Sequence, residues 1–188
     1  MRIPSKVRTL IAGLLSVAIL LCSCSSSKSD TAADRCAKYI GEVDYASTVS
    51  ALVYEQVPDE EGRYGIVYRA VSDMDGLLAQ TQTPVCLYFY DYMSGGEVSG
   101  VTAGVEDLAQ SLYDQVLFVA VDGIAEYELG DKYGVDAYPE FVLIVPGKQE
   151  VKFEGMNFEA WTINDVAVGM AQNGYTPDMA KLDEGEAQ

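Results

Sequence analysis

A run of apolar residues followed by a regularly spaced apolar pattern is the strongest signal in this chain. Residues 85–90 (VCLYFY) are apolar or aromatic at every position, which is typical of a short strand covered on both faces. After a polar, glycine-rich turn, apolar residues recur every three or four positions, at 98, 101, 105, 108 and 112. This spacing predicts a long helix with one buried face.

The chain before this unit carries a weaker pattern. Residues 48–71 favour a β-hairpin around the turn at 58–62, although a helix remains possible for the first arm because its apolar residues also fit a helical period. Ser72 and Asp73 offer an N-cap for a short helix that ends before Thr83.

The chain after this unit alternates between strands and helices. Strands are predicted at 116–122 and 141–145, helices at 124–132 and 164–171, and a closing hairpin at 141–153. Strands that alternate with helices indicate an α/β sheet, and the closing hairpin indicates an antiparallel edge.

The turn that separates the strand from the long helix reads Ser94-Gly95-Gly96-Glu97. A serine followed three residues later by a glutamate has the form of a capping box, in which each side chain accepts from the backbone amide of the other residue. A plain helix start therefore explains these residues without any further function.

Two segments of the chain resemble thioredoxins. TPVCLYFYDYM (residues 83–93) resembles the strand that leads to the thioredoxin active site, and DKYGVDAYPEFVLIVPG (residues 131–147) resembles the segment that carries the cis-proline of that family. The resemblance spans about 64–172. It implies a thioredoxin-like three-layer α/β/α fold with a mixed central sheet, preceded by an N-terminal extension.

The resemblance places the thioredoxin Cys-Gly-Pro-Cys motif on residues 94–97, where neither cysteine is present. The buried aspartate of the family and its lysine partner would fall at Tyr88 and Ala120. Thiol–disulfide exchange needs an acidic thiolate and a second thiol that resolves the mixed disulfide. We therefore expect no catalytic residues here.

The resemblance also places the cis-proline at Pro139, preceded by Tyr138. Tyr92, Met93, Tyr138 and Pro139 would then line a groove for an extended peptide, and methionine beside aromatic residues suits adaptable binding. The alternative is that Pro139 only shapes its turn and that its neighbours are ordinary surface residues.

The N-terminus predicts a secretory signal. Three basic residues precede an uncharged apolar stretch of 12 residues at 10–21, which is shorter than the roughly 20 residues that span a bilayer. The sequence that follows resembles the lipobox of bacterial lipoproteins, with Cys24 as the expected lipid-bearing residue, Cys22 as second choice, and a plain cleaved signal as the alternative. A lipid would hold the protein on the outer side of the cell membrane.

These features predict a linear domain organisation. We expect a lipoprotein signal peptide at 1–23, a flexible tether at 24–33, an N-terminal extension at 34–62, a thioredoxin-like domain at 63–173 and an acidic tail at 174–188.

Composition narrows the chemistry further. The chain has a formal net charge of −17, which becomes −20 without residues 1–23, so nucleic acid and anionic lipid headgroups are disfavoured as partners. It contains no histidine and only four cysteines, two of them at the lipobox, so we expect no metal site and no cofactor. Cys86 lies within the predicted central strand and is expected to be a small buried hydrophobe, whereas Cys36 lies in the N-terminal part without a clear pattern. A disulfide between the two remains open.

Three functional hypotheses follow. The first is a lipid-anchored, extracytoplasmic and redox-inactive module that binds an extended peptide or an envelope protein. The second is a thiol-disulfide oxidoreductase of cell-envelope redox homeostasis that uses Cys36, Cys86 or the thiol of a partner. In the third, the N-terminal hairpin forms the binding surface and the thioredoxin-like body carries it.

Overall fold

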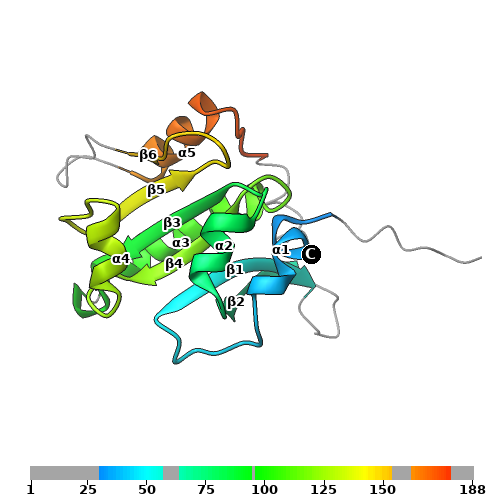
Figure 1. Ribbon diagram of the computed structural model, residues 1–188. Coiled ribbons are helices and arrows are strands. Elements are labelled where there is room, and N and C mark those ends of the chain that lie inside the picture. Colours follow the sequence, from blue (N-terminus) through cyan, green and yellow to red (C-terminus); the bar gives the residue numbers. More distant parts are fainter. Residues whose placement is uncertain (1–29, 57–63, 95, 154–161, 179–188) are drawn as a thin grey trace, which may run out of the picture.

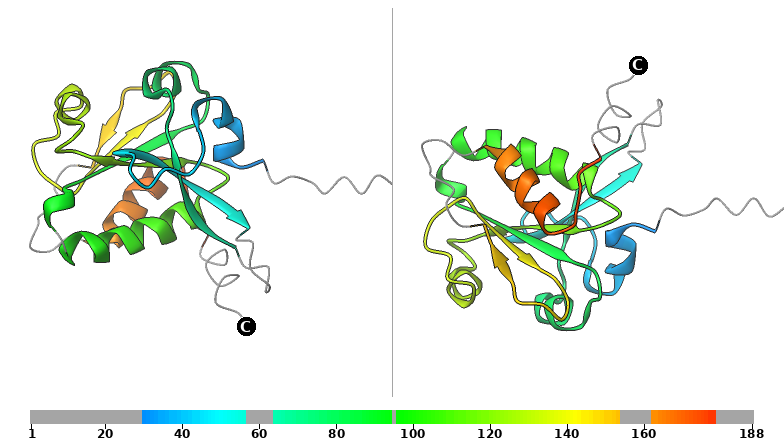
Figure 2. Two further views of the ribbon diagram at one scale, coloured as in Figure 1. Left: turned by 90° about the horizontal axis from the view of Figure 1, so that it is seen from below. Right: turned by 90° about the horizontal axis from the view of Figure 1, so that it is seen from above.

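A mixed six-stranded sheet between two layers of helices forms the body of the protein. The computed structural model describes residues 30–56, 64–94, 96–153 and 162–178. Its strands follow the order β2-β1-β4-β3-β5-β6. Helices α3 (Gly96–Ser111) and α5 (Ile163–Gln172) cover one face, while α1 (Ala32–Arg35), α2 (Met74–Gln80) and α4 (Tyr127–Lys132) cover the other (Figures 1 and 2). This is the predicted three-layer α/β/α architecture.

Strand β3 (Val85–Tyr90) occupies the centre of the sheet, as its sequence predicts. It pairs parallel to β4 (Leu117–Asp122) and antiparallel to β5 (Glu140–Ile144), which pairs in turn with β6 (Val151–Lys152). Cys86 and Tyr88 pack under α3 and α5, whereas Leu87 and Phe89 pack under the opposite helices. Two buried faces explain why the strand has no polar alternation.

The predicted hairpin is present and forms the other side of the sheet. Strand β1 (Val49–Gln56) is antiparallel to β2 (Tyr64–Ala70) and also pairs with β4. The β1–β2 register runs from Ser50 opposite Ala70 to Gln56 opposite Tyr64. The first arm is therefore a strand and not a helix. Because β1 pairs with both β2 and β4, the hairpin belongs to the same sheet as the central strand.

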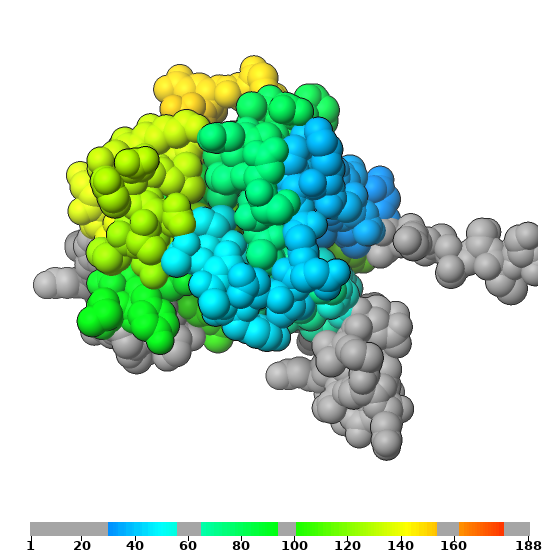
Figure 3. Space-filling model, turned by 60° about the horizontal axis from the view of Figure 1, so that its bottom comes forward, coloured from blue at the N-terminus to red at the C-terminus, as the bar shows by residue number. Residues whose placement is uncertain are grey.

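The carboxyl ends of β3 and β4 lie at one end of the sheet. The turn η2 (Tyr92–Ser94) follows β3 there, and the segment leading into α4 follows β4. Since β1 runs antiparallel to β4, the segment before β1 reaches the same end, and the space-filling view shows these parts of the surface together (Figure 3).

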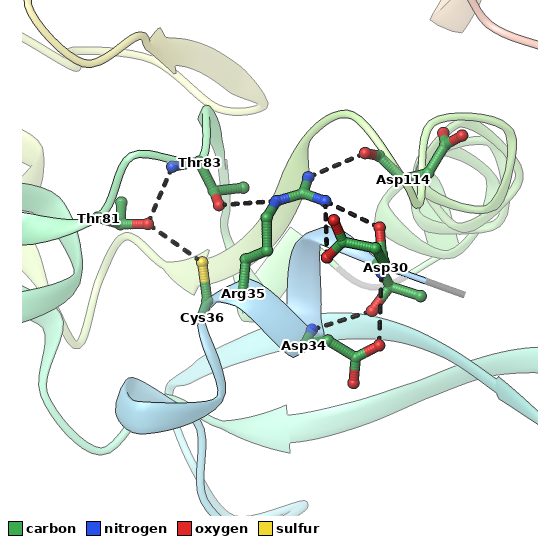
Figure 4. Close-up of polar contacts among 8 residues, drawn as sticks. Asp30, Asp34, Arg35, Cys36, Thr81, Thr83 and Asp114 are labelled. Carbon is green, nitrogen blue, oxygen red and sulfur yellow. Dashed lines mark hydrogen bonds and ion pairs between the residues drawn. The ribbon is translucent and has the colours of Figure 1, made fainter. Parts of the chain in front are cut away.

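The opposite end of the sheet receives the N-terminal segment. A capping box between Thr31 and Asp34 begins α1, and the short helix η1 (Ala37–Tyr39) follows. Arg35 holds this segment in place: its Nε donates to Thr83 Oγ1 at 3.2 Å and its Nη2 donates to the carbonyl of Asp114 at 2.9 Å (Figure 4). One side chain thus joins α1 to the residues that precede β3 and β4.

Within the described residues, no helix is both long enough and apolar enough to cross a bilayer. The expected signal peptide and the lipid-bearing cysteine lie outside the described residues, as do most of the tether and of the acidic tail.

We predict that Arg35→Ala lowers the free energy of unfolding by about 1–2 kcal/mol, because it removes charge-assisted hydrogen bonds that are only partly shielded from water. Urea denaturation followed by circular dichroism measures the change. Lys148→Ala, which removes an exposed cation on the β5–β6 turn, is the matched control and should leave the midpoint unchanged. Equal effects of the two substitutions would show that Arg35 contributes nothing specific.

Candidate functional site

Hydrogen bonds between loops tie together the end of the sheet where β3 and β4 finish. The amide of Gly123 donates to the carbonyl of Tyr90 at 2.8 Å, which joins the ends of the two parallel strands. The amide of Asp122 donates to the carbonyl of Thr48 at 2.8 Å, which adds the segment before β1. In open α/β sheets this end is where ligands usually bind, so it is the place to test the predicted groove.

Tyr138 packs closely against the turn after β4. Its hydroxyl donates to the carbonyl of Gly123 at 2.9 Å, and a Cβ atom on Gly123 would lie 2.1 Å from the tyrosine ring. Only glycine allows this approach. The peptide bond between Tyr138 and Pro139 is cis, and both side chains are half-buried.

Acidic groups surround Tyr138. Partial burial raises the pKa of its phenol, and the negative charges of Asp91, Asp122 and Asp131 raise this pKa further. These carboxylates come from three different elements: Asp91 follows β3, Asp122 ends β4 and Asp131 lies in α4. Tyr138 is therefore a neutral hydrogen-bond donor in a negative environment.

Tyr92 and Met93 project from the surface beside this loop. Their exposed fractions are 73% and 81%, and the amide of Met93 donates to Asp91 Oδ1 at 2.8 Å. Side chains this exposed stand out from the surface instead of lining a closed cleft. Of the four predicted groove residues, Tyr138 and Pro139 are half-buried, and Tyr92 and Met93 are exposed. The groove itself stays a prediction.

The turn at 94–97 is described only in part. Ser94 ends η2 and Gly96 begins α3, so the backbone makes the predicted change from turn to helix. Gly95 and the side chains of Ser94 and Glu97 lie outside the described residues. The capping box therefore stays a prediction.

The two positions that the sequence resemblance assigns to the buried aspartate and the lysine of thioredoxins hold a tyrosine and an alanine. Tyr88 and Ala120 are partners in the β3–β4 register, with exposed fractions of 1% and 5%. The Tyr88 ring stacks on Phe141 at a centroid distance of 5.1 Å, and its hydroxyl lies 3.2 Å from Thr102 Oγ1. Burial raises the pKa of Tyr88, so this position holds a neutral phenol and not a carboxylate that could accept a proton.

The two described cysteines lie on opposite faces of the sheet. Cys86 packs under α3, and Cys36 packs under α2 with its Sγ 3.4 Å from Thr81 Oγ1. Both are free and both have an exposed fraction of 0%. Burial raises the pKa of the Cys86 thiol. The disulfide that the sequence left open is absent.

Three exposed apolar residues at the same end of the sheet were not predicted as part of the site. Tyr45 lies before β1, Ile124 follows β4 and Tyr127 begins α4. The sequence does not show that they lie together, because only the pairing of β1 with β4 brings residue 45 to this end. The one available local signal was a large apolar residue within an otherwise polar loop.

Comparisons with known proteins agree with this architecture. The thioredoxin family model matches residues 68–166, and no curated protein sequence matches the chain. Similar solved structures include the germline-specific thioredoxin Deadhead of Drosophila melanogaster, with 21% identity, a TM-score of 0.41, and coverage of 48% of this chain and 81% of that one.

Two further thioredoxins resemble the chain to a similar degree. Mitochondrial thioredoxin 3 of Saccharomyces cerevisiae has 22% identity and a TM-score of 0.38, over 53% of this chain and 82% of that one. Thioredoxin NaTrxh of Nicotiana alata has 15% identity and a TM-score of 0.38, over 50% and 76%. Since the family model spans more than half of the sequence, this chain belongs to the thioredoxin family.

Proposed function

We propose that this protein is a lipid-anchored, extracytoplasmic member of the thioredoxin family that has no redox activity and binds a peptide or protein partner. The binding site is the end of the sheet formed by Tyr92, Met93, Tyr138 and Pro139. The observation that carries the proposal is the position of the thiols: Cys36 and Cys86 are fully buried in two separate cores, while aromatic and methionine side chains occupy the expected site.

The lack of redox activity follows from what thiol exchange requires. The attacking group must be a thiolate that reaches the disulfide of its substrate, and a low thiol pKa favours that form. The Cys86 thiol has a raised pKa and no exposed surface. The sequence places Ser94 and Glu97 where the two active cysteines of the family would stand. A hydroxyl and a carboxylate cannot exchange a disulfide.

A binding role is supported by the combination of a fixed base and an exposed edge. Tyr138 is held by its hydrogen bond to Gly123 and by ring packing that excludes a larger residue there. Tyr92 and Met93 remain solvent-exposed, and a flexible thioether beside an aromatic ring adapts to different partners. Pre-organised contacts reduce the entropy lost on binding.

The anchor and the binding site belong to opposite ends of the domain. Arg35 fixes the N-terminal segment beside Thr83 and Asp114, at the amino ends of β3 and β4. A lipid on Cys24 would therefore hold the domain by the end farthest from Tyr138.

We expect the protein to show no turnover above background in an insulin-reduction assay, and Cys86→Ala to change nothing, because neither Cys36 nor Cys86 is exposed. A thioredoxin serves as positive control. Turnover that Cys86→Ala abolishes would instead assign the protein to the oxidoreductases.

We also expect Cys36 and Cys86 to resist alkylation by iodoacetamide in the native state and to react fully in denaturant, because both side chains are fully buried. Mass spectrometry of proteolytic peptides measures the modification at each position. Rapid native labelling at either cysteine, or a disulfide-linked peptide pair, would contradict the proposed redox inactivity.

Lipid attachment is tested by replacing each candidate cysteine. We expect Cys24→Ser to move the protein from the membrane fraction to the soluble fraction and to abolish incorporation of labelled palmitate, whereas Cys22→Ser leaves both unchanged. The reverse result would assign the lipid to Cys22. Retention of lipid in the double variant would refute attachment at either cysteine, and absence of labelled palmitate from the unsubstituted protein would refute the anchor.

A further inference from the structure

Exposed apolar side chains concentrate at one end of the molecule. The described residues include six large hydrophobic side chains that are well exposed, and five of them lie at the carboxyl end of β3 and β4: Tyr45, Tyr92, Met93, Ile124 and Tyr127, with exposed fractions of 84%, 73%, 81%, 55% and 60%. The sixth, Val168, lies on α5. Single exposed apolar residues need no explanation, but a cluster of them marks an interaction surface.

We name the segments 41–48, 91–93 and 122–131 the distal surface. Hydrogen bonds connect 122–131 to 41–48: the amide of Asp122 donates to the carbonyl of Thr48, and the hydroxyl of Thr48 donates to the carboxylate of Glu126. The amide of Gly123 donates to the carbonyl of Tyr90, the residue directly before 91–93. Figure 3 shows the three segments, coloured cyan, green and yellow-green, side by side on one face. The exposed apolar residues are therefore presented by loops with fixed relative positions.

The distal surface is strongly acidic. Its three segments contain seven aspartate and glutamate residues and no lysine or arginine. Several of these carboxylates accept hydrogen bonds from nearby backbone amides, as Asp44 does from Ala46 and Asp122 does from Ile124. Such bonds orient a carboxylate without neutralising it, so the surface keeps its negative charge.

We propose that the distal surface docks a segment of a partner protein that combines lysine or arginine with aromatic or aliphatic side chains. This inference rests on the proposed binding function and specifies its partner. Apolar side chains of the segment would cover Tyr45, Ile124 and Tyr127, and its cations would pair with the surrounding carboxylates and with the faces of exposed tyrosines.

The negative charge of the distal surface favours a cationic partner over a second copy of this chain and over an uncharged apolar segment. A second copy of the chain would bring a surface of the same sign against the first, and the chain as a whole carries a net charge of −17. An uncharged apolar segment would strip water from the carboxylates without replacing it, which costs free energy. A segment that carries both cations and apolar side chains can pair with the carboxylates and cover the exposed apolar residues of this surface.

The test uses the full chain and a short fluorescein-labelled peptide in which lysine, phenylalanine and serine repeat. Matched peptides carry glutamate in place of lysine, or serine in place of phenylalanine. Fluorescence anisotropy gives the dissociation constants, and changes in backbone amide chemical shifts locate the contact. We expect the lysine–phenylalanine peptide to bind most tightly and to shift amides of the distal surface.

Two double variants and two matched controls separate the apolar and the acidic contributions. Ile124→Ser with Tyr127→Ser should weaken binding about tenfold, as loss of central apolar contacts does, while Val168→Ser changes it less than twofold.

Glu128→Gln with Asp131→Asn should weaken binding about threefold and reduce its salt dependence. Asp107→Asn with Glu150→Gln, which neutralises exposed carboxylates elsewhere, should have no such effect.

The outcomes separate this inference from the function on which it rests. Equal binding of the glutamate peptide, or equal losses in the matched controls, would overturn the cationic partner; amide shifts at Tyr92, Met93 and Tyr138 would in that case still support a binding site at this end. Absence of binding and of shifts with every peptide would overturn both.

Discussion

Pairing of β4 with two different neighbours is the constraint on which the rest of this molecule depends. Its parallel pairing with β3 brings the ends of two strands together, and its antiparallel pairing with β1 brings the segment before β1 to the same place. These pairings bring Asp91, which follows β3, and Asp122, which ends β4, close enough to Tyr138 to raise the pKa of its phenol. They also leave the opposite end of the sheet to the N-terminal segment.

The central strand and the helix after it could be predicted because their signals are local. Every side chain of β3 is apolar or aromatic because both faces of the strand are covered, and α3 keeps a helical apolar period because only one of its faces is buried. The position of Pro139 followed from the resemblance of the surrounding segment to thioredoxins. These parts needed no knowledge of which elements meet in space.

The remaining parts depend on contacts between residues far apart in the chain. The first arm of the hairpin fits a helix and a strand equally well in sequence, and its position between β2 and β4 decides for the strand. The hydrogen bonds of Arg35 to Thr83 and Asp114 join segments that sequence reasoning treated separately. The exposed residues Tyr45 and Tyr127 carry no local signal of their shared location.

The structure also separates what the thioredoxin fold provides from what its usual chemistry requires. The fold still brings the loop before β5 to the turn after β4, where Tyr138 packs on Gly123. The two thiols within the described residues lie elsewhere: Cys36 and Cys86 fill the two cores as small apolar groups. Burial of both described thiols is consistent with our proposal that this member of the family recognises a partner without thiol chemistry.

The most direct test of this account is photo-crosslinking from position 92 in intact cells that produce the protein. A photoreactive phenylalanine analogue at position 92 should form an adduct that resists reductant and persists unchanged when Cys36 and Cys86 are both replaced by alanine. The same analogue at position 168, on α5, should form none. An adduct that is lost on reduction, or that requires either cysteine, would contradict the claim that this end of the sheet binds its partner without thiol chemistry.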